Sequence, residues 1–309
     1  MAVQRCTSTT AHSLQNLIGH KRQGALIFSH AGTVLAAGVN VNIRPPVVAG
    51  QFYPADPQDL IEMLKNLCDP IPEEKKIKAK AIIVPHAGYI YSGRVAGMVY
   101  SRVKIPKNII LLGPNHTGYG PEISTYPDGY WLTPLGKVPV NENLTAELTS
   151  TNIYIPDYTA HVYEHSLEVQ LPFLQFLAQE DFKIVPTVFK FLNLDTCLLA
   201  GDFLANVLEN KNDYLIVIST DFSHYVPYEV AKQKDALAIK QILNLDPENL
   251  YKVVIENDIS MCGVVPATVA LRALKHLGAK KAELVAYQTS GDVNQDYSSV
   301  VGYAGIIIS

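Results

Sequence analysis

Cysteine is scarce in this sequence, and the few cysteines stand far apart. The 309 residues contain Cys6, Cys68, Cys197 and Cys262, with no CxxC pair among them. This spacing excludes a zinc ribbon and argues against a framework of disulfides. We therefore expect a protein of a reducing compartment, the cytoplasm.

Long apolar runs and charge of a single sign are also missing. No stretch reaches the roughly 18 uncharged apolar residues that a membrane span needs. The formal net charge is only −4, and no basic run is present. We expect neither a membrane span nor a nucleic-acid partner. The chain also lacks the GxSxG, GxxxxGK[ST] and GxGxxG patterns, which excludes the common serine hydrolase and nucleotide-binding classes.

Acidic residues are absent from the start of the chain, where none precedes Asp56. Residues 1–42 are instead rich in Ser and Thr, with a few basic residues, a composition found in targeting segments. We interpret residues 1–42 as a poorly ordered extension or as the product of a start assigned too far upstream. Residues 43–309 contain no linker that would divide them, so we predict one domain there.

Short β-rich apolar runs alternate with helix-length segments from Ala79 onward, a pattern typical of a sheet covered by helices. We predict an α/β fold with a central, largely parallel or mixed sheet. The expected helices are 54–68, 92–103, 141–151, 164–179, 195–210, 228–244, 246–257 and 265–278. The expected strands are 79–85, 108–113, 183–189, 214–220, 282–288 and 300–308.

Three of the predicted strands lead directly into a histidine or a carboxylate. The runs are IIVPHAGY, ILLGPNHTG and VISTDFSHY, which carry His86, His116, Asp221 and His224. The carboxyl ends of parallel strands meet at one edge of a sheet, where functional crevices lie. One such histidine alone is usually a hydrogen-bonded structural residue, but three strand ends together favour a shared site.

Cys262 adds a thiol to this set, in a predicted turn between two helices. A thiol beside imidazoles suits Zn, Fe or Cu, whereas Mg and Ca prefer oxygen ligands. Two histidines and one cysteine leave a coordination position open, as a catalytic centre requires. Asp221 is then a fourth ligand or orients an imidazole, and His224 is a candidate general acid or base. A lone cysteine is otherwise most often a small buried hydrophobe.

A second polar cluster lies in HVYEHSLEVQLPF, which contains Glu164, His165 and Glu168. We predict that Glu164 opens a helix and that Glu164 and His165 lie on the substrate side of the site or support the metal ligands, with a plain helix cap as the alternative. Tyr89 and Tyr91 could donate hydrogen bonds in the pocket or pack against the sheet.

The ordered set IRPPVVAGQFYPADP, VPHAGYIYSG, LGPNH, EHSLEVQLPF, STDFSHY and MCGVVP resembles the Memo family, which includes protein B of the AmmeMemoRadiSam gene set. The resemblance covers residues 43–309 and implies a fold like that of LigB-type class III extradiol dioxygenases, which are iron enzymes. It further implies that His86, His116 and Cys262 are the metal ligands and that Asp221, His224 and Phe52 belong to the pocket. LigB enzymes have Glu as the third ligand, so Cys262 departs from their pattern.

Two hypotheses follow from these residues. The first is a metal-dependent oxidoreductase, dioxygenase-like, in which Fe(II) is the preferred metal, with Cu or Zn as alternatives, and a small molecule such as a phenol enters the open position. The second is a binding module without chemistry, which holds a peptide or a small acidic ligand in the same crevice. Metal-assisted hydrolysis with Zn²⁺ is a third alternative.

Overall fold

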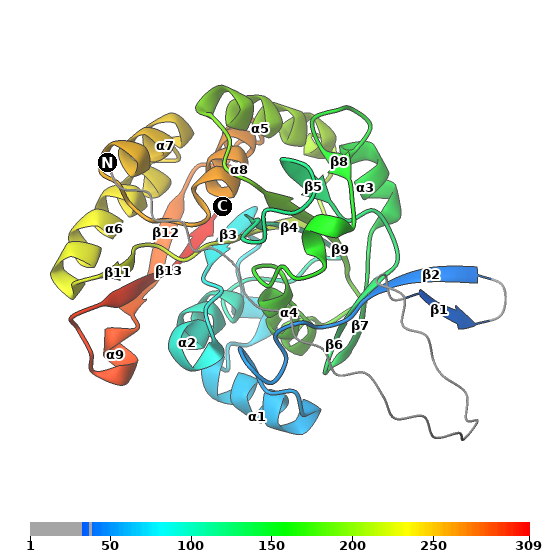
Figure 1. Ribbon diagram of the computed structural model, residues 1–309, viewed down its shortest axis with the longest axis horizontal. Helices are drawn as coiled ribbons and strands as arrows, with labels where there is room; N and C mark the ends of the chain where they lie inside the picture. Colours follow the sequence, from blue (N-terminus) through cyan, green and yellow to red (C-terminus); the bar gives the residue numbers. More distant parts are fainter. Residues whose placement is uncertain (1–32, 37–38) are drawn as a thin grey trace, which may run out of the picture. The chain divides into compact units, whose positions relative to one another are not determined.

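A sheet of nine strands runs through the part of the chain that the computed structural model describes, residues 33–36 and 39–309 (Figure 1). In spatial order the strands are β11 (His224–Val226), β13 (Val300–Ile308), β3 (Ala81–Val84), β10 (Tyr214–Ser219), β4 (Asn108–Pro114), β9 (Lys183–Phe189), β5 (Ile123–Thr125) and β8 (Ile155–Pro156). The remaining strand, β12 (Ala282–Thr289), pairs with β13.

The middle of this sheet is parallel. β3, β10, β4 and β9 pair in parallel, while β13 is antiparallel to β3 and β5 is antiparallel to β9. The prediction of a largely parallel or mixed sheet is therefore confirmed. Because these four strands point the same way, the loops that follow β3, β10 and β4 leave the sheet at the same edge.

Helices cover both faces of the sheet, as the apolar strands require. Neighbouring residues of a strand point to opposite faces, so Ile83 packs in one hydrophobic cluster and Ile82 in the other. The first cluster includes α3 (Glu142–Leu148), α5 (Leu194–Leu208), α6 (Tyr228–Leu243), α7 (Pro247–Glu256) and α8 (Val264–His276). The second includes α1 (Pro57–Leu67), α2 (Tyr89–Tyr100) and α4 (Leu171–Leu177). Within the described residues, no helix has the length and apolar character to cross a bilayer.

Side-chain caps start several helices where the sequence predicts them. Asp56, Asn141, Asn193 and Asp246 each accept a hydrogen bond from a backbone N–H group of the first turn. These bonds satisfy donors that a helix start leaves without a partner. The helix boundaries therefore follow from local chemistry.

A second, four-stranded sheet has the order β1 (Thr33–Ala36), β2 (Val39–Arg44), β6 (Tyr130–Thr133) and β7 (Gly136–Pro139). The sequence prediction missed these short strands. The interpretation of residues 1–42 falls mostly outside the described residues, of which only β1 and the beginning of β2 lie in that range.

The helix predicted from Glu164 is wrong at its start. Residues 164–167 are irregular, residues 168–170 form one 3-10 turn, and α4 begins only at Leu171 with Pro172 in its first turn. Proline suits that first turn because its missing N–H would have no partner there. Four of the preceding polar side chains are fully buried, and each bonds elsewhere in the protein: Glu164, Ser166, Glu168 and Gln170.

The ion pair between Arg44 and Glu168 ties this buried segment to the start of the domain. Arg44 Nη1 lies 2.8 Å from Glu168 Oε2, and neither side chain is more than 2% exposed. Glu168 also accepts hydrogen bonds from the backbone of Val47 and Val48 and from the Tyr53 hydroxyl. Arg44 in turn stacks on Trp131, with its guanidinium carbon 4.1 Å from the ring centroid.

Removing Arg44 should destabilise the protein far more than removing an arginine at the surface. Arg44→Ala leaves the Glu168 carboxylate buried without its cation, and a loss of this kind costs about 3–5 kcal/mol. Arg94 is a matched control, because its pair with Asp69 is 44% exposed on the arginine side. Arg94→Ala should cost about 1 kcal/mol or less. Urea unfolding measures the free energy of unfolding of both variants. Equal losses in Arg44→Ala and Arg94→Ala would contradict this account.

Candidate metal centre

The loops that follow β3, β4 and β10 bring the predicted residues together. His86, His116, Asp221 and His224 all line one cavity of about 410 Å³. The His86 and His116 ring centroids lie 5.2 Å apart, and the backbone N–H of His86 donates to Asp221 Oδ1 at 2.9 Å. The carboxyl edge of the parallel strands therefore brings these four residues to one cavity.

His86 is buried, and its hydrogen bonds define which nitrogen is free. Nδ1 lies 2.9 Å from Ser219 Oγ. That hydroxyl already donates to the Ser166 carbonyl and accepts from Gln170, so it can only accept from His86. Nδ1 therefore carries the hydrogen, and Nε2 keeps a lone pair toward the cavity. Burial, and the neighbouring histidines, hold the pKa of His86 well below its usual value, which keeps the ring neutral.

His116 is oriented in the same way by Glu164. Its Nδ1 donates to Glu164 Oε1 at 2.9 Å, so in the neutral ring Nε2 is again the nitrogen with the lone pair. The second Glu164 oxygen accepts from the backbone N–H of His116. Burial opposes ionisation of both groups, but the pair outweighs it, lowering the pKa of Glu164 to about 2 and raising that of His116. A carboxylate behind an imidazole is the usual support of a metal-ligating histidine.

His165 completes a set of three imidazoles. One ligand atom each from His86, His116 and His165 lies within 4.8 Å of the others, and this is the group among the described residues that could hold a metal ion. His165 Nδ1 lies 3.6 Å from Glu164 Oε1, which is too long for a hydrogen bond. Burial of the His165 ring lowers its pKa, which favours the neutral ring, in which one nitrogen has a free lone pair.

Cys262 lies beside the Nε2 atom of His86 and is not part of that set of three. Its Sγ atom is 3.3 Å from His86 Nε2 and accepts a hydrogen bond from the backbone N–H of Asp221 at 3.2 Å. Burial and the nearby Asp221 charge raise the pKa of the thiol, so the sulfur is protonated when no metal is bound. Its role as a ligand stays a prediction.

Asp221 and His224 occupy different positions at this site. Asp221 is buried beside His86, where burial raises the pKa of its carboxyl group to about 6. His224 Nδ1 donates to the Ser260 carbonyl at 2.8 Å, because a carbonyl oxygen can only accept. The His224 Nε2 atom is consequently free to exchange a proton with a molecule in the cavity.

The aromatic residues predicted for the pocket divide into two groups. Phe52 and Tyr91 line the cavity, and the Phe52 ring stands edge-on to His165 with centroids 4.8 Å apart. Tyr89 is not among the lining residues. It is buried against Tyr53 and Phe173, and its hydroxyl donates to the Val169 carbonyl at 2.6 Å. Tyr89 therefore packs behind the site.

The sequence analysis did not single out Ser219, Gln170 or Ser260, although all three fix site histidines. The sequence does contain a signal for Ser219 and Gln170. In EHSLEVQ, polar residues recur within a stretch that leads into an apolar helix, and Ser219 directly precedes the turn of STDFSHY. Buried polar side chains need partners, so such residues are candidates for support of a site.

Asp235 forms hydrogen bonds to the loop that contains Asp221 and His224. This buried carboxylate on α6 accepts hydrogen bonds from the backbone and the hydroxyl of Ser223, at 3.0 and 2.6 Å, and from the Tyr287 hydroxyl at 2.7 Å. Gly302 lets the strand β13 approach, because a Cβ atom there would collide with Asp235. Burial raises the pKa of Asp235.

Asp235→Asn should stabilise the protein at neutral pH but not in acid. The amide oxygen can accept both bonds from Ser223, and the amide nitrogen can donate to the Tyr287 hydroxyl oxygen, so three hydrogen bonds remain without a buried charge. The pKa of Asp235 is higher in the folded protein than its value of 3.8 in the unfolded chain. The wild type therefore loses free energy of unfolding as the pH rises from 3.8 through the folded pKa. The variant and the wild type should therefore agree near pH 3.8 and diverge above it. The urea midpoints of the two proteins across this pH range measure the difference in stability. A difference that does not change with pH would contradict the raised pKa of Asp235.

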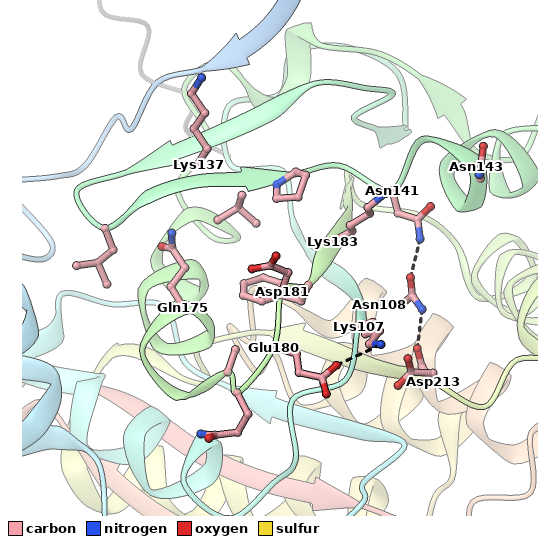
Figure 2. A pocket seen from close by; sticks show the side chains of 16 residues that line it. Lys107, Asn108, Lys137, Asn141, Asn143, Gln175, Glu180, Asp181, Lys183 and Asp213 are labelled. Atoms are coloured by element: carbon pink, nitrogen blue, oxygen red, sulfur yellow. Dashed lines mark hydrogen bonds and ion pairs between the residues drawn. The ribbon is translucent and has the colours of Figure 1, made fainter.

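A larger cavity of about 910 Å³ lies at the opposite, amino-terminal edge of the strands (Figure 2). Its lining mixes lysines with acidic side chains and amides, including Lys107, which pairs with Glu180 at 3.2 Å. Lys107 and Asn108 precede or open β4, and Asp213 directly precedes β10. No group of metal-binding side chains is found there among the residues that the structure describes. The smaller cavity is therefore the candidate site.

Two comparisons of the sequence with known proteins agree on one family. The Memo-like protein family pattern matches residues 44–307. A MEMO1 family protein of Aquifex aeolicus is 49% identical over 267 residues, which cover 86% of this chain and 99% of the relative. One of Ignicoccus hospitalis is 44% identical over 278 residues, which cover 85% and 98%. A crystal structure of an uncharacterized protein from Escherichia coli K12 shares the fold, with a TM-score of 0.52 and 14% identity over 74% of this chain and all of that one.

Proposed function

Since the chain belongs to the Memo-like family, we propose that it is a metal-dependent oxidoreductase of dioxygenase-like type whose metal is held by His86 and His116. The observation that carries this proposal is the orientation of the two rings. In both, Nδ1 donates to a buried acceptor, so Nε2 of the neutral ring presents its lone pair at the cavity. A hydrogen bond of this kind fixes the tautomer that a ligating histidine needs.

We assign Cys262 as the third ligand and His165 as the alternative. Bonds of about 2.1 Å from nitrogen and about 2.3 Å from sulfur, at angles of about 90–110°, separate the two ligand atoms by roughly 3.1–3.6 Å. The 3.3 Å between His86 Nε2 and Cys262 Sγ fits this range. His165 is the alternative because it shares the set of three imidazoles.

A set of imidazole and thiolate ligands favours Fe(II), with Cu or Zn as alternatives, over Mg or Ca. Bound iron would supply the redox chemistry for the O₂-dependent oxidation of an organic molecule. The chain's own contribution is to hold that molecule in the cavity and to move its proton. His224 Nε2 would accept a proton from a hydroxyl group of the bound molecule, while the Nδ1–H bond to Ser260 keeps the ring in place.

The cavity limits the size of the substrate. A volume of about 410 Å³ suits a small molecule, and the lining combines aromatic rings with hydroxyl and amide groups. A small phenol meets these conditions, because its ring would contact Phe52 or Tyr91 and its hydroxyl would face the imidazoles. We place this activity in the cytoplasm, where Cys262 would stay reduced.

Elemental analysis after anaerobic purification tests the ligands. The wild type should hold about one Fe or Cu per chain, and His86→Ala should hold almost none. Cys262→Ser should lose most of the metal, whereas His165→Ala should lose little. His276→Ala is the matched control, because His276 is exposed on α8 and pairs with Asp202.

If His165→Ala instead loses the metal and Cys262→Ser keeps it, the three imidazoles are the ligands. A wild type that binds no stoichiometric metal under these conditions would contradict the proposal itself. The crevice would then be interpreted as a binding site for a peptide or a small acidic ligand.

A further inference from the structure

Tyr225 occupies an irregular position at the edge of the candidate site. In the antiparallel pair of β11 and β13, His224 lies opposite Val301 and Val226 lies opposite Val300, and the register shifts between them. Tyr225 is therefore the extra residue of a β-bulge. Bulges of this kind re-aim a side chain and occur often beside active sites.

The backbone at Tyr225 is also strained. Its φ angle is 56°, in the left-handed region that bulky residues rarely adopt. The side chain gains little packing in return, because Tyr225 is 79% exposed. A tyrosine here is thus unfavourable for folding on both counts, and such strain tends to persist where a function needs it.

The exposed ring of Tyr225 nevertheless lies beside residues of the candidate site. Tyr225 lines the mouth of the cavity that contains His86 and His116, and its ring centroid lies 6.0 Å from that of His224. Phe52, Tyr91 and Tyr303 line the same cavity, whereas no lysine or arginine is among its described lining residues. An aromatic ligand would find rings here, but an anionic group would find no lysine or arginine side chain among those described residues.

We propose that Tyr225 is a specificity-determining residue, which the bulge presents as a wall for the aromatic ring of a ligand whose polar head reaches the metal. The inference rests on the proposed function, because the head group needs the metal of His86 and His116. Ligands with the same head but without a ring would not use Tyr225. Two probes separate these contributions: benzohydroxamate and acetohydroxamate carry the same metal-chelating head, and only the first has an aromatic ring.

The test measures both hydroxamates by calorimetric titration into metal-loaded protein. Tyr225→Gly and Tyr225→Asn should weaken benzohydroxamate roughly three- to tenfold, the range expected for one aromatic contact. Tyr225→Phe should bind it within about twofold of the wild type, because the ring stays. Acetohydroxamate should change less than about twofold in all three variants.

Stability provides a second readout that a purely structural tyrosine would not give. Glycine and asparagine accept a positive φ more easily than tyrosine, so Tyr225→Gly and Tyr225→Asn should raise the melting temperature while they weaken benzohydroxamate. Asp258→Gly is the matched control, because Asp258 also has a positive φ, 47°, is exposed, and is not among the residues that line the cavity. That variant should not alter the affinity for either probe.

Equal losses for the two hydroxamates, or unchanged benzohydroxamate affinity in Tyr225→Gly, would overturn the inference. A melting temperature that falls in Tyr225→Gly and Tyr225→Asn would also overturn it, because the tyrosine would then be needed for folding. Failure of the proposed function is distinguishable, since in that case wild-type protein would take up no metal and bind neither probe.

Discussion

The candidate site depends on the burial of one polar segment, residues 164–170. Glu164 and Glu168 are both fully buried, and a buried carboxylate is tolerable only when donors surround it. The donors come from different parts of the chain: Arg44 and Tyr53 for Glu168, and His116 for Glu164. The need to satisfy two carboxylates thus fixes the loops that carry the site histidines against the sheet.

Much of the fold could be predicted because its signals are local. The runs in β3, β4, β9 and β10 are mostly apolar, since both faces of these strands are buried, and residues such as Asp56 mark helix starts. The strands of the smaller sheet gave no comparable signal. They are short, and β2 and β6 pair at only two residues of each strand, across distant parts of the sequence.

The site was predictable where the strands determine it. His86, His116 and Asp221 each follow a parallel strand, so strand order alone brings them together. His165 and Glu164 were placed less accurately, because periodicity suggested a helix there. The actual backbone is set by buried hydrogen bonds of Glu164, Ser166 and Gln170, and such long-range contacts leave no periodic pattern. The Tyr89 side chain turns into the core. Its position also depends on long-range packing, which leaves no periodic pattern in the sequence.

The most direct test of the central claim is an anomalous difference map from crystals loaded anaerobically with Fe(II). We predict one strong peak within bonding distance of Nε2 of both His86 and His116, with Nδ1 of the same rings still bonded to Ser219 and Glu164. A peak at the Nδ1 atoms, in the polar cavity at the other edge of the sheet, or nowhere in the crystal would contradict the account.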